Sequence, residues 1–283
     1  RQHARTFATT PSMASGHNRW SKIRHEKGAA DMKKTAQRNV FAKHLTLYSK
    51  LYGGDPALNS QLASVIAAAK KAGMPKANID AAVARGQGKS TTGEKLEAAT
   101  FEVIVSGPTA ASSVAIVVDI ESDNKTRSIK DLRVVAKKHK ALAAPTAFQF
   151  TRTGRIVLGP PAESEQPAEE DRFDDVLMAA VEAGAEDVEQ DDEGNFLLWT
   201  QPGSTHHVAQ TVAKELGLQI LESDIIYKPT AEMVAVDDEA AAQALAAFLA
   251  AVKEYPDVQA IYSNAIKGAI SEEAWAKIDE SLD

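Results

Sequence analysis

Two β-rich runs frame the middle of the chain: Arg155-Ile156-Val157-Leu158 at one end and Gln219-Ile220-Leu221-Glu222-Ser223-Asp224-Ile225-Ile226-Tyr227 at the other. Between them, hydrophobic periodicity predicts two helices and two strands. In chain order these are Phe173–Ala183 (helix), Asp187–Glu189 (strand), Asn195–Thr200 (strand) and His206–Leu216 (helix). The order strand–helix–strand–strand–helix–strand is ferredoxin-like. We therefore expect residues 147–228 to form a ferredoxin-like α/β domain.

Further strand-like and helical runs lie on both sides of this unit. The preceding part has the order strand–strand–helix, and the following part has the order strand–helix–strand. The expected strands are Thr100–Val105, Val114–Ile120, Met233–Val236 and Val258–Ser263, and the expected helices are Ser128–His139 and Glu239–Glu254. A further expected strand, Ala147–Phe150, lies at the start of residues 147–228. We expect residues 93–146 and 229–283 to form a second, outer ferredoxin-like domain into which 147–228 is inserted. With the N-terminal bundle, the predicted fold is α+β multidomain.

Residues 16–92 have helical patterns and predict a basic three-helix bundle. The first helix, from about Ala29 to Tyr52, ends at Gly53-Gly54. Asp55 is the expected N-cap of the second helix, with Pro56 in its first turn. The third helix runs from Pro75 to Gly86. The predicted apolar stripes are Phe41, Leu45, Tyr48 and Tyr52 on the first helix, and Leu58, Leu62, Val65, Ile66 and Ala69 on the second. A small, polar linker over 87–98 follows.

Charge is divided sharply along the chain. Residues 1–92 hold 16 of the 32 Lys+Arg but only 4 of the 39 Asp+Glu, a net charge of +12, so the remainder carries −19. A basic end on an acidic body indicates contact with a polyanion through that end. The alternative is a soluble protein whose solvated charges are unevenly distributed and which binds no polyanion. The chain has no cysteine, which excludes disulfides, thiolate metal sites and cysteine nucleophiles. No apolar run reaches the roughly 20 residues of a membrane span.

The first residues have the composition of a mitochondrial presequence. Glu26 is the first acid, whereas Arg1, Arg5 and several Ser and Thr precede it. Arg5-Thr6-Phe7 before Ala8 resembles a matrix-protease cleavage site. We expect residues 1–15 to be a presequence or a disordered arm, and the protein to be in the mitochondrial matrix. The alternative is a basic arm used for binding.

The densest functional signal directly follows this start. It reads Gly16-His17-Asn18-Arg19-Trp20-Ser21-Lys22-Ile23-Arg24-His25-Glu26-Lys27. Cations neutralise phosphates, and a Trp can stack on a base or anchor the segment in a core. More cations follow on the first helix. The candidate RNA-binding residues are His17, Arg19, Trp20, Lys22, Arg24, His25, Lys27, Lys33, Lys34, Arg38 and Lys43.

This segment resembles the opening of the YebC-like family, Gly-His-Ser-Lys-Trp-x-x-Ile-Lys-His-x-Lys. The resemblance spans nearly all of the chain after residue 15. It continues at Lys33, Phe41, Lys43, Gly53-Gly54-Asp55-Pro56, Asn59, Leu62, Met74-Pro75, Asn78-Ile79, Ala84-Arg85-Gly86, Ser122-Asp123-Asn124-Lys125-Thr126-Arg127, Ala183-Gly184-Ala185-Glu186-Asp187, Asp257-Val258-Gln259 and Tyr262-Ser263-Asn264. It implies one helical and two α/β domains, and a role as a transcriptional regulator or a translation factor that acts on ribosomes.

The presequence-like start narrows this expectation to the mitochondrial branch, whose member activates translation of cytochrome c oxidase subunit I. The chain departs from the family pattern at Gly107-Pro108, where Thr109-Ala110 replaces the usual two glycines. The loop over 160–172 is also longer and more acidic than usual.

Apparent enzyme motifs are weak. Gly88-Lys89-Ser90 lacks the upstream glycine of a P-loop, since Val83 stands there. His206-His207 point about 100° apart on a helix, which is a poor metal pair. Asp191-Asp192-Glu193-Gly194 lacks the ligand spacing of an EF-hand and favours a hairpin turn.

We therefore expect a monomeric, non-enzymatic translation factor that binds mRNA or ribosomal RNA of the mitochondrial ribosome, without a cofactor. The alternative is a DNA-binding transcriptional regulator, because a three-helix bundle can read a DNA groove. An enzyme with an unrecognised site between the α/β domains is a third, weaker reading.

Overall fold

The structure is a computed structural model that describes residues 37–109, 112–160, 172–230 and 233–283. In the helical domain, residues 37–52 are helical, followed by α2 (Ser60–Lys71) and α3 (Lys76–Gly86). Leu45 and Tyr48 are buried on the predicted stripe, and Gly53 ends the helix with a φ of 92°. The predicted start of this helix at Ala29 lies outside the described residues.

The predicted N-cap of the second helix is wrong. Asn59 caps α2, because its Oδ1 accepts a hydrogen bond from the Leu62 N–H at 3.0 Å. Asp55 instead closes a tight turn through the Ala57 N–H at 2.9 Å. The buried Asn59 amide also donates to the carbonyls of Tyr48 (2.9 Å) and Gly53 (2.8 Å). These contacts place the cap four residues later than predicted and leave Leu58 86% exposed.

The inner sheet has the strand order β5-β6-β4-β7, and all its pairs are antiparallel. This is the ferredoxin-like order expected for this stretch. Buried residues of α5 and α6, including Val176, Ala180, Val208 and Val212, pack against the sheet. The elements are β4 (Phe150–Gly159), α5 (Phe173–Ala183), β5 (Ala185–Gln190), β6 (Phe196–Thr200), α6 (Thr205–Leu216) and β7 (Gln219–Pro229).

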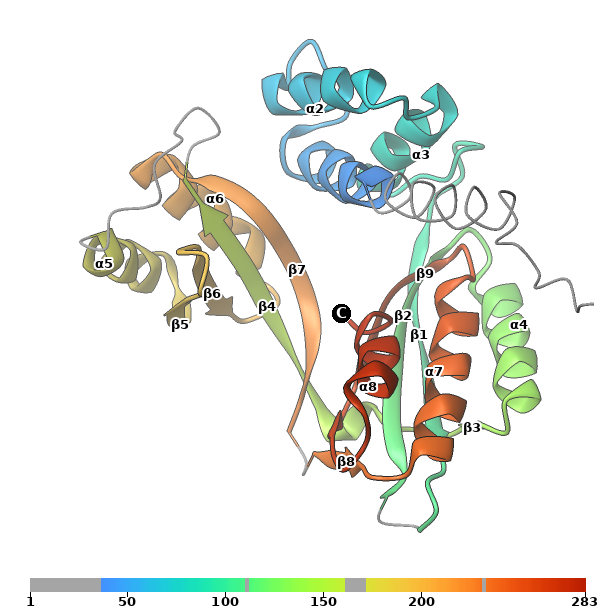
Figure 1. Ribbon diagram of the computed structural model, residues 1–283. Helices are drawn as coiled ribbons and strands as arrows, with labels where there is room; N and C mark the ends of the chain where they lie inside the picture. Colours follow the sequence, from blue (N-terminus) through green and yellow to red (C-terminus); the bar gives the residue numbers. More distant parts are fainter. Residues whose placement is uncertain (1–36, 110–111, 161–171, 231–232) are drawn as a thin grey trace, which may run out of the picture.

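The outer sheet has the order β3-β1-β2-β9. Strand β9 pairs with β2, so chain segments on either side of the inner unit meet in one sheet. Helices α4 and α7 lie along one face of this sheet (Figure 1). The elements are β1 (Glu97–Val105), β2 (Val114–Ser122), α4 (Lys125–Lys138), β3 (Leu142–Ala143), α7 (Glu239–Lys253) and β9 (Val258–Ser263).

The expected ferredoxin-like order of the outer unit is wrong. Strand β8 (Val234–Val236) pairs in parallel with β10 (Ala265–Lys267) in a separate two-stranded sheet, and helix α8 (Glu272–Asp279) follows. Most of the expected strand Ala147–Phe150 is the 3₁₀ turn η2 (Ala147–Gln149). The Glu102 carboxylate stabilises this turn by accepting from the N–H groups of Thr146 (2.6 Å) and Ala147 (2.8 Å).

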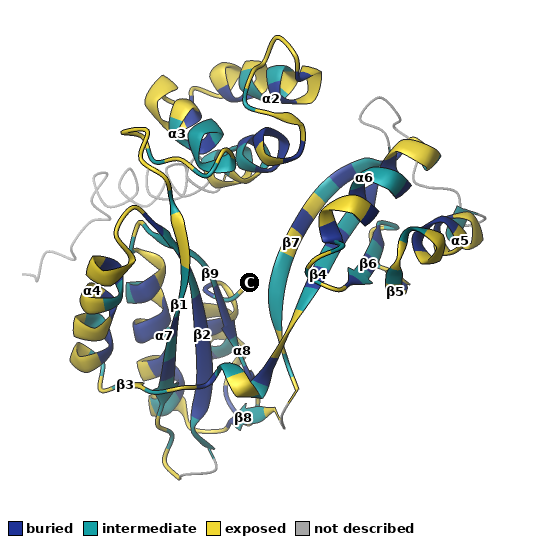
Figure 2. Cartoon of the chain, turned by 180° about the vertical axis from the view of Figure 1, so that it is seen from behind, coloured by how far each residue is buried: buried dark blue, intermediate teal, exposed yellow. Residues whose placement is uncertain are grey.

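The three parts are packed together. Residues of the helical domain and the inner unit share one buried cluster, which includes Leu45, Tyr48, Leu158 and Ile220. The inner and outer units meet where the rings of Tyr227 and Tyr262 lie 5.5 Å apart. Buried positions extend along the central strands of the outer sheet, whereas α4 is exposed over most of its outer side (Figure 2).

Candidate nucleic-acid interface

Most of the predicted RNA-binding residues cannot be placed. His17, Arg19, Trp20, Lys22, Arg24, His25, Lys27, Lys33 and Lys34 lie outside the described residues. Arg38 and Lys43 lie on the described part of the first helix. They are five residues apart, so their side chains leave the helix about 140° apart. The structure therefore does not bring these two cations together.

Arg38 belongs to a cluster at the turn between α2 and α3. Its guanidinium donates to the carbonyl of Gly73 at 3.4 Å. Lys70 and Lys71 end α2, Lys76 begins α3, and all three lysines are exposed. The turn is fixed by Gly73, with a φ of 74°, and by the buried Met74. We call Arg38, Lys70, Lys71 and Lys76 the basic corner.

The basic corner carries uncompensated charge. None of its four cations forms an ion pair with an acid of the described chain. A helix dipole favours Lys70 and Lys71 in the last turn of α2, so local stability explains these two. It disfavours Lys76 at the first position of α3. The corner therefore offers cations that can bind phosphates, and local helix stability does not explain why a lysine stands at position 76.

Lys43 lies in a different environment. Its ammonium is 3.6 Å from the Asp283 carboxylate, and its side chain is 76% exposed. An exposed pair of this kind contributes little to stability. The neighbouring acid reduces the positive potential that Lys43 offers to a phosphate. Lys43 is thus a weaker candidate than Arg38.

The lysines of the basic corner were missed in the sequence. Lys70, Lys71 and Lys76 lie more than thirty positions from Arg38 in the chain, and only the α2–α3 turn brings them together. The net charge of residues 1–92 was the one signal that included them.

The predicted hairpin turn after Asp191 is confirmed, since the Asp191 carboxylate accepts hydrogen bonds from the N–H groups of Glu193 (2.9 Å) and Asn195 (2.8 Å).

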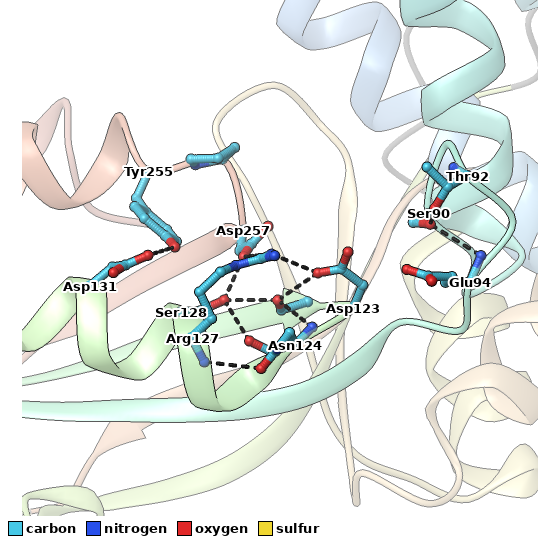
Figure 3. A network of polar contacts seen from close by, with 12 residues as sticks. Ser90, Thr92, Glu94, Asp123, Asn124, Arg127, Ser128, Asp131, Tyr255 and Asp257 are labelled. Carbon is cyan, nitrogen blue, oxygen red and sulfur yellow. Dashed lines mark hydrogen bonds and ion pairs between the residues drawn. The ribbon is translucent and has the colours of Figure 1, made fainter.

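A polar network holds the start of α4 (Figure 3). Asn124 caps the helix by accepting from the Arg127 N–H at 3.1 Å. The buried Ser128 hydroxyl lies 2.8 Å from Ser122 Oγ and 2.6 Å from Asp257 Oδ2. Arg127 pairs with Asp123 at 2.6 Å. The Ser-Asp-Asn motif therefore fixes α4 to the turn before β9.

The described part of the chain offers neither a metal centre nor a membrane-spanning helix. It holds no group of three His, Asp or Glu side chains that could bind a metal ion. None of its helices combines the length and apolar character needed to cross a bilayer.

Comparison with known proteins identifies the family. Residues 18–89 match the TACO1/YebC protein N-terminal domain, and residues 96–265 match the TACO1/YebC second and third domain. The chain belongs to the TACO1/YebC family. The expected family is thereby confirmed.

Relatives of this TACO1/YebC chain are bacterial proteins named probable transcriptional regulatory protein. The one from Thiobacillus denitrificans is 34% identical over 256 residues, 89% of this chain and 98% of the relative. The one from Rubrobacter xylanophilus is 33% identical over 267 residues, 93% and 99% of the two chains. A solved structure of a conserved hypothetical protein from Aquifex aeolicus matches with a TM-score of 0.53 and 29% identity, over 84% of this chain and 92% of that one.

Proposed function

We propose that this TACO1/YebC protein is a translation factor of the mitochondrial matrix that binds mRNA or ribosomal RNA through its helical domain. It acts on the mitochondrial ribosome by binding and positioning, as a monomer and without catalysis or a small-molecule cofactor. By family resemblance, the message it activates is that of cytochrome c oxidase subunit I. The observation that carries the proposal is the unpaired basic corner, on the same domain as the Gly16–Lys27 motif.

The matrix location rests on the N-terminal composition. Arginines without any acid before Glu26 are typical of an imported protein. Fractionation of cells that express the tagged chain tests this location. A chain without residues 1–15 is expected in the cytosol and the full chain in the matrix. Equal distributions of the two would contradict the location.

DNA binding is the second candidate, because the bacterial relatives are named transcriptional regulators. A groove-reading helix needs side chains that reach base edges. The exposed residues of α3 include Lys76, Ala77, Asn78 and Asp80, which offer one ammonium, one amide and one acid. Arg85 of the same helix is already bonded to Gln259 and to the Pro256 carbonyl. This surface suits phosphate contact better than base reading.

The test is a salt titration of the full chain with single-stranded RNA. The variant Lys70→Gln, Lys71→Gln, Lys76→Gln removes three phosphate contacts, so the slope of log K against log salt becomes shallower by about 2. A matched variant, Lys253→Gln, Lys267→Gln, Lys277→Gln, removes equal charge from lysines that already bond to the backbone carbonyl of Glu280 and to the carboxylates of Glu272 and Glu273. It keeps the original slope. Equal slopes for the two variants would refute the role of the corner.

A further inference from the structure

Helix α4 is a basic element within the acidic part of the chain. Residues 125–140 contain seven Lys+Arg and one acid, although residues 93–283 carry a net charge of −19. All seven cations are exposed. The average charge of the α/β domains therefore conceals a strongly positive helix.

The cations lie on the side of α4 that faces away from the core. Ser128, Leu132 and Ala136 are buried and face the sheet. Lys130, Arg133 and Lys137 follow at spacings of three and four, which places them on one face of the helix. This set projects opposite the buried residues. We call Lys130, Arg133 and Lys137 the α4 face.

Local stability does not account for the α4 face. Like charges at spacings of three and four destabilise a helix. No acid in the described ranges pairs with these three cations. The single acid of the helix, Asp131, accepts a hydrogen bond from the Tyr255 hydroxyl at 2.8 Å. The helix dipole favours Lys137 near the C-terminal end, but it gives no such support to Lys130 or Arg133 in the middle.

The start of α4 lies close to the helical domain. Arg85 of α3 donates to the Pro256 carbonyl at 3.4 Å, and Arg127 of α4 lies 3.8 Å from Asp257. One turn, 256–257, therefore separates a cation of the helical domain from a cation of α4. The hairpin of Ser90 and Glu94, which leaves the helical domain, lies beside the same network (Figure 3). The N-terminal end of α4, and with it the element that carries the α4 face, therefore adjoins the end of α3 in the helical domain.

We propose that the α4 face is a second phosphate-binding surface, which holds the backbone of the same RNA that the helical domain binds. This inference rests on the proposed function. An anionic membrane is a poorer partner, because membrane helices insert an apolar face. The apolar face of α4 is already buried on the sheet, and Val134, 65% exposed, lies among the cations. With only this one exposed apolar side chain among them, the cations of α4 suit a phosphodiester backbone, which is recognised through its charge.

The first experiment is photo-crosslinking of the full chain to labelled single-stranded RNA. A benzophenone amino acid replaces Val134 on α4 in one protein, and Met178 on α5 in another. Both positions are exposed, and α5 lies on the opposite side of the molecule from α4 (Figure 1). A strong RNA adduct is expected at Val134 and little at Met178. Equal yields at the two positions would overturn the proposal.

The second experiment separates this inference from the proposed function. The variant Lys130→Gln, Arg133→Gln, Lys137→Gln is compared with the basic-corner variant in the salt titration, after circular dichroism has confirmed folding. Each triple substitution is expected to make the slope of log K against log salt shallower by about 2. If only the corner variant changes the slope, the α4 inference is wrong and the proposed function stands. If neither changes it, both are wrong. Binding to phosphatidylserine vesicles that is lost with the α4 variant, at unchanged RNA affinity, would also overturn the inference.

Discussion

The hydroxyl of Tyr48 joins the helical domain to the inner sheet. It accepts a hydrogen bond from the Gln219 side-chain amide at 2.6 Å and donates to the Ile220 carbonyl at 3.4 Å. The ring is buried in the cluster that the two parts share. The helical domain is therefore held against the inner unit rather than carried on a free linker.

Removing this hydroxyl is expected to loosen the contact without destroying the core. Tyr48→Phe keeps the ring but leaves the Gln219 amide without this acceptor, so the free energy of unfolding falls by about 1–2 kcal/mol. Tyr48→Ala also creates a cavity and costs about 3–5 kcal/mol. Urea unfolding of both variants measures these losses. A Phe variant that is as destabilised as the Ala variant would contradict the division between hydrogen bond and packing.

Gly86 allows α3 to cross closely over the first helix. A Cβ at this position would overlap the Thr46 carbonyl oxygen and lie 2.7 Å from the Ser49 Cβ. Gly86→Ala is therefore expected to destabilise the protein by about 1–3 kcal/mol through overpacking. The control is Gly203→Ala, where a Cβ meets no atom within 4 Å. Its effect on thermal unfolding is expected within about 0.5 kcal/mol. Equal effects of the two substitutions would refute the close crossing.

Asp119 gives the stability a dependence on pH. Burial, with the nearby Glu121 charge, raises the pKa of its carboxyl from 3.8 to about 6, while Arg152 and Lys50 oppose the shift. The unfolded state ionises first, so this group lowers stability as pH rises from about 4 to above 6. The full shift corresponds to about 3 kcal/mol, which partial solvent exposure reduces to roughly 1–2 kcal/mol.

The variant Asp119→Asn tests this effect. Its unfolding free energy is expected to exceed that of the original chain at pH 8, with the difference vanishing below about pH 4. Glu121→Gln is the control, because it lowers the pKa of Asp119 and moves the dependence to lower pH. If the free energies of unfolding of the Asn variant and the original chain differ by a constant amount from about pH 4 to pH 8, the raised pKa of Asp119 is contradicted.

Periodicity predicted the longer elements well. Helix α5 has the predicted bounds, Phe173–Ala183. In β6, Phe196, Leu198 and Thr200 are buried in alternation, as a strand with one face on a core requires. These patterns span enough residues for local hydrophobicity to determine the structure.

Shorter features depended on contacts that a sequence pattern does not contain. Strands β8 and β10 have three residues each, too few for periodicity, and their pairing separated β8 from the predicted sheet. Asp55 and Asn59 are both good helix caps, and the hydrogen bonds of Asn59 to Tyr48 and Gly53 decided between them.

The candidate site was predictable only in part. Arg38 was expected and lies in the basic corner, whereas Lys76 joins it through a turn whose geometry the sequence does not specify. The α4 face was overlooked because charge was averaged over 93–283, although a window of one helix would have found it. Local charge windows are therefore more informative than domain averages.

Ultraviolet crosslinking of the full chain in intact mitochondria, with sequencing of the attached nucleic acid, measures whether the protein binds RNA there. We predict fragments of ribosomal RNA or mRNA, attached to peptides from residues 16–92 and from α4. Their yield is expected to fall in the Lys70→Gln, Lys71→Gln, Lys76→Gln variant. Recovery of DNA fragments in place of RNA, or no nucleic acid attached to these peptides, would contradict this prediction.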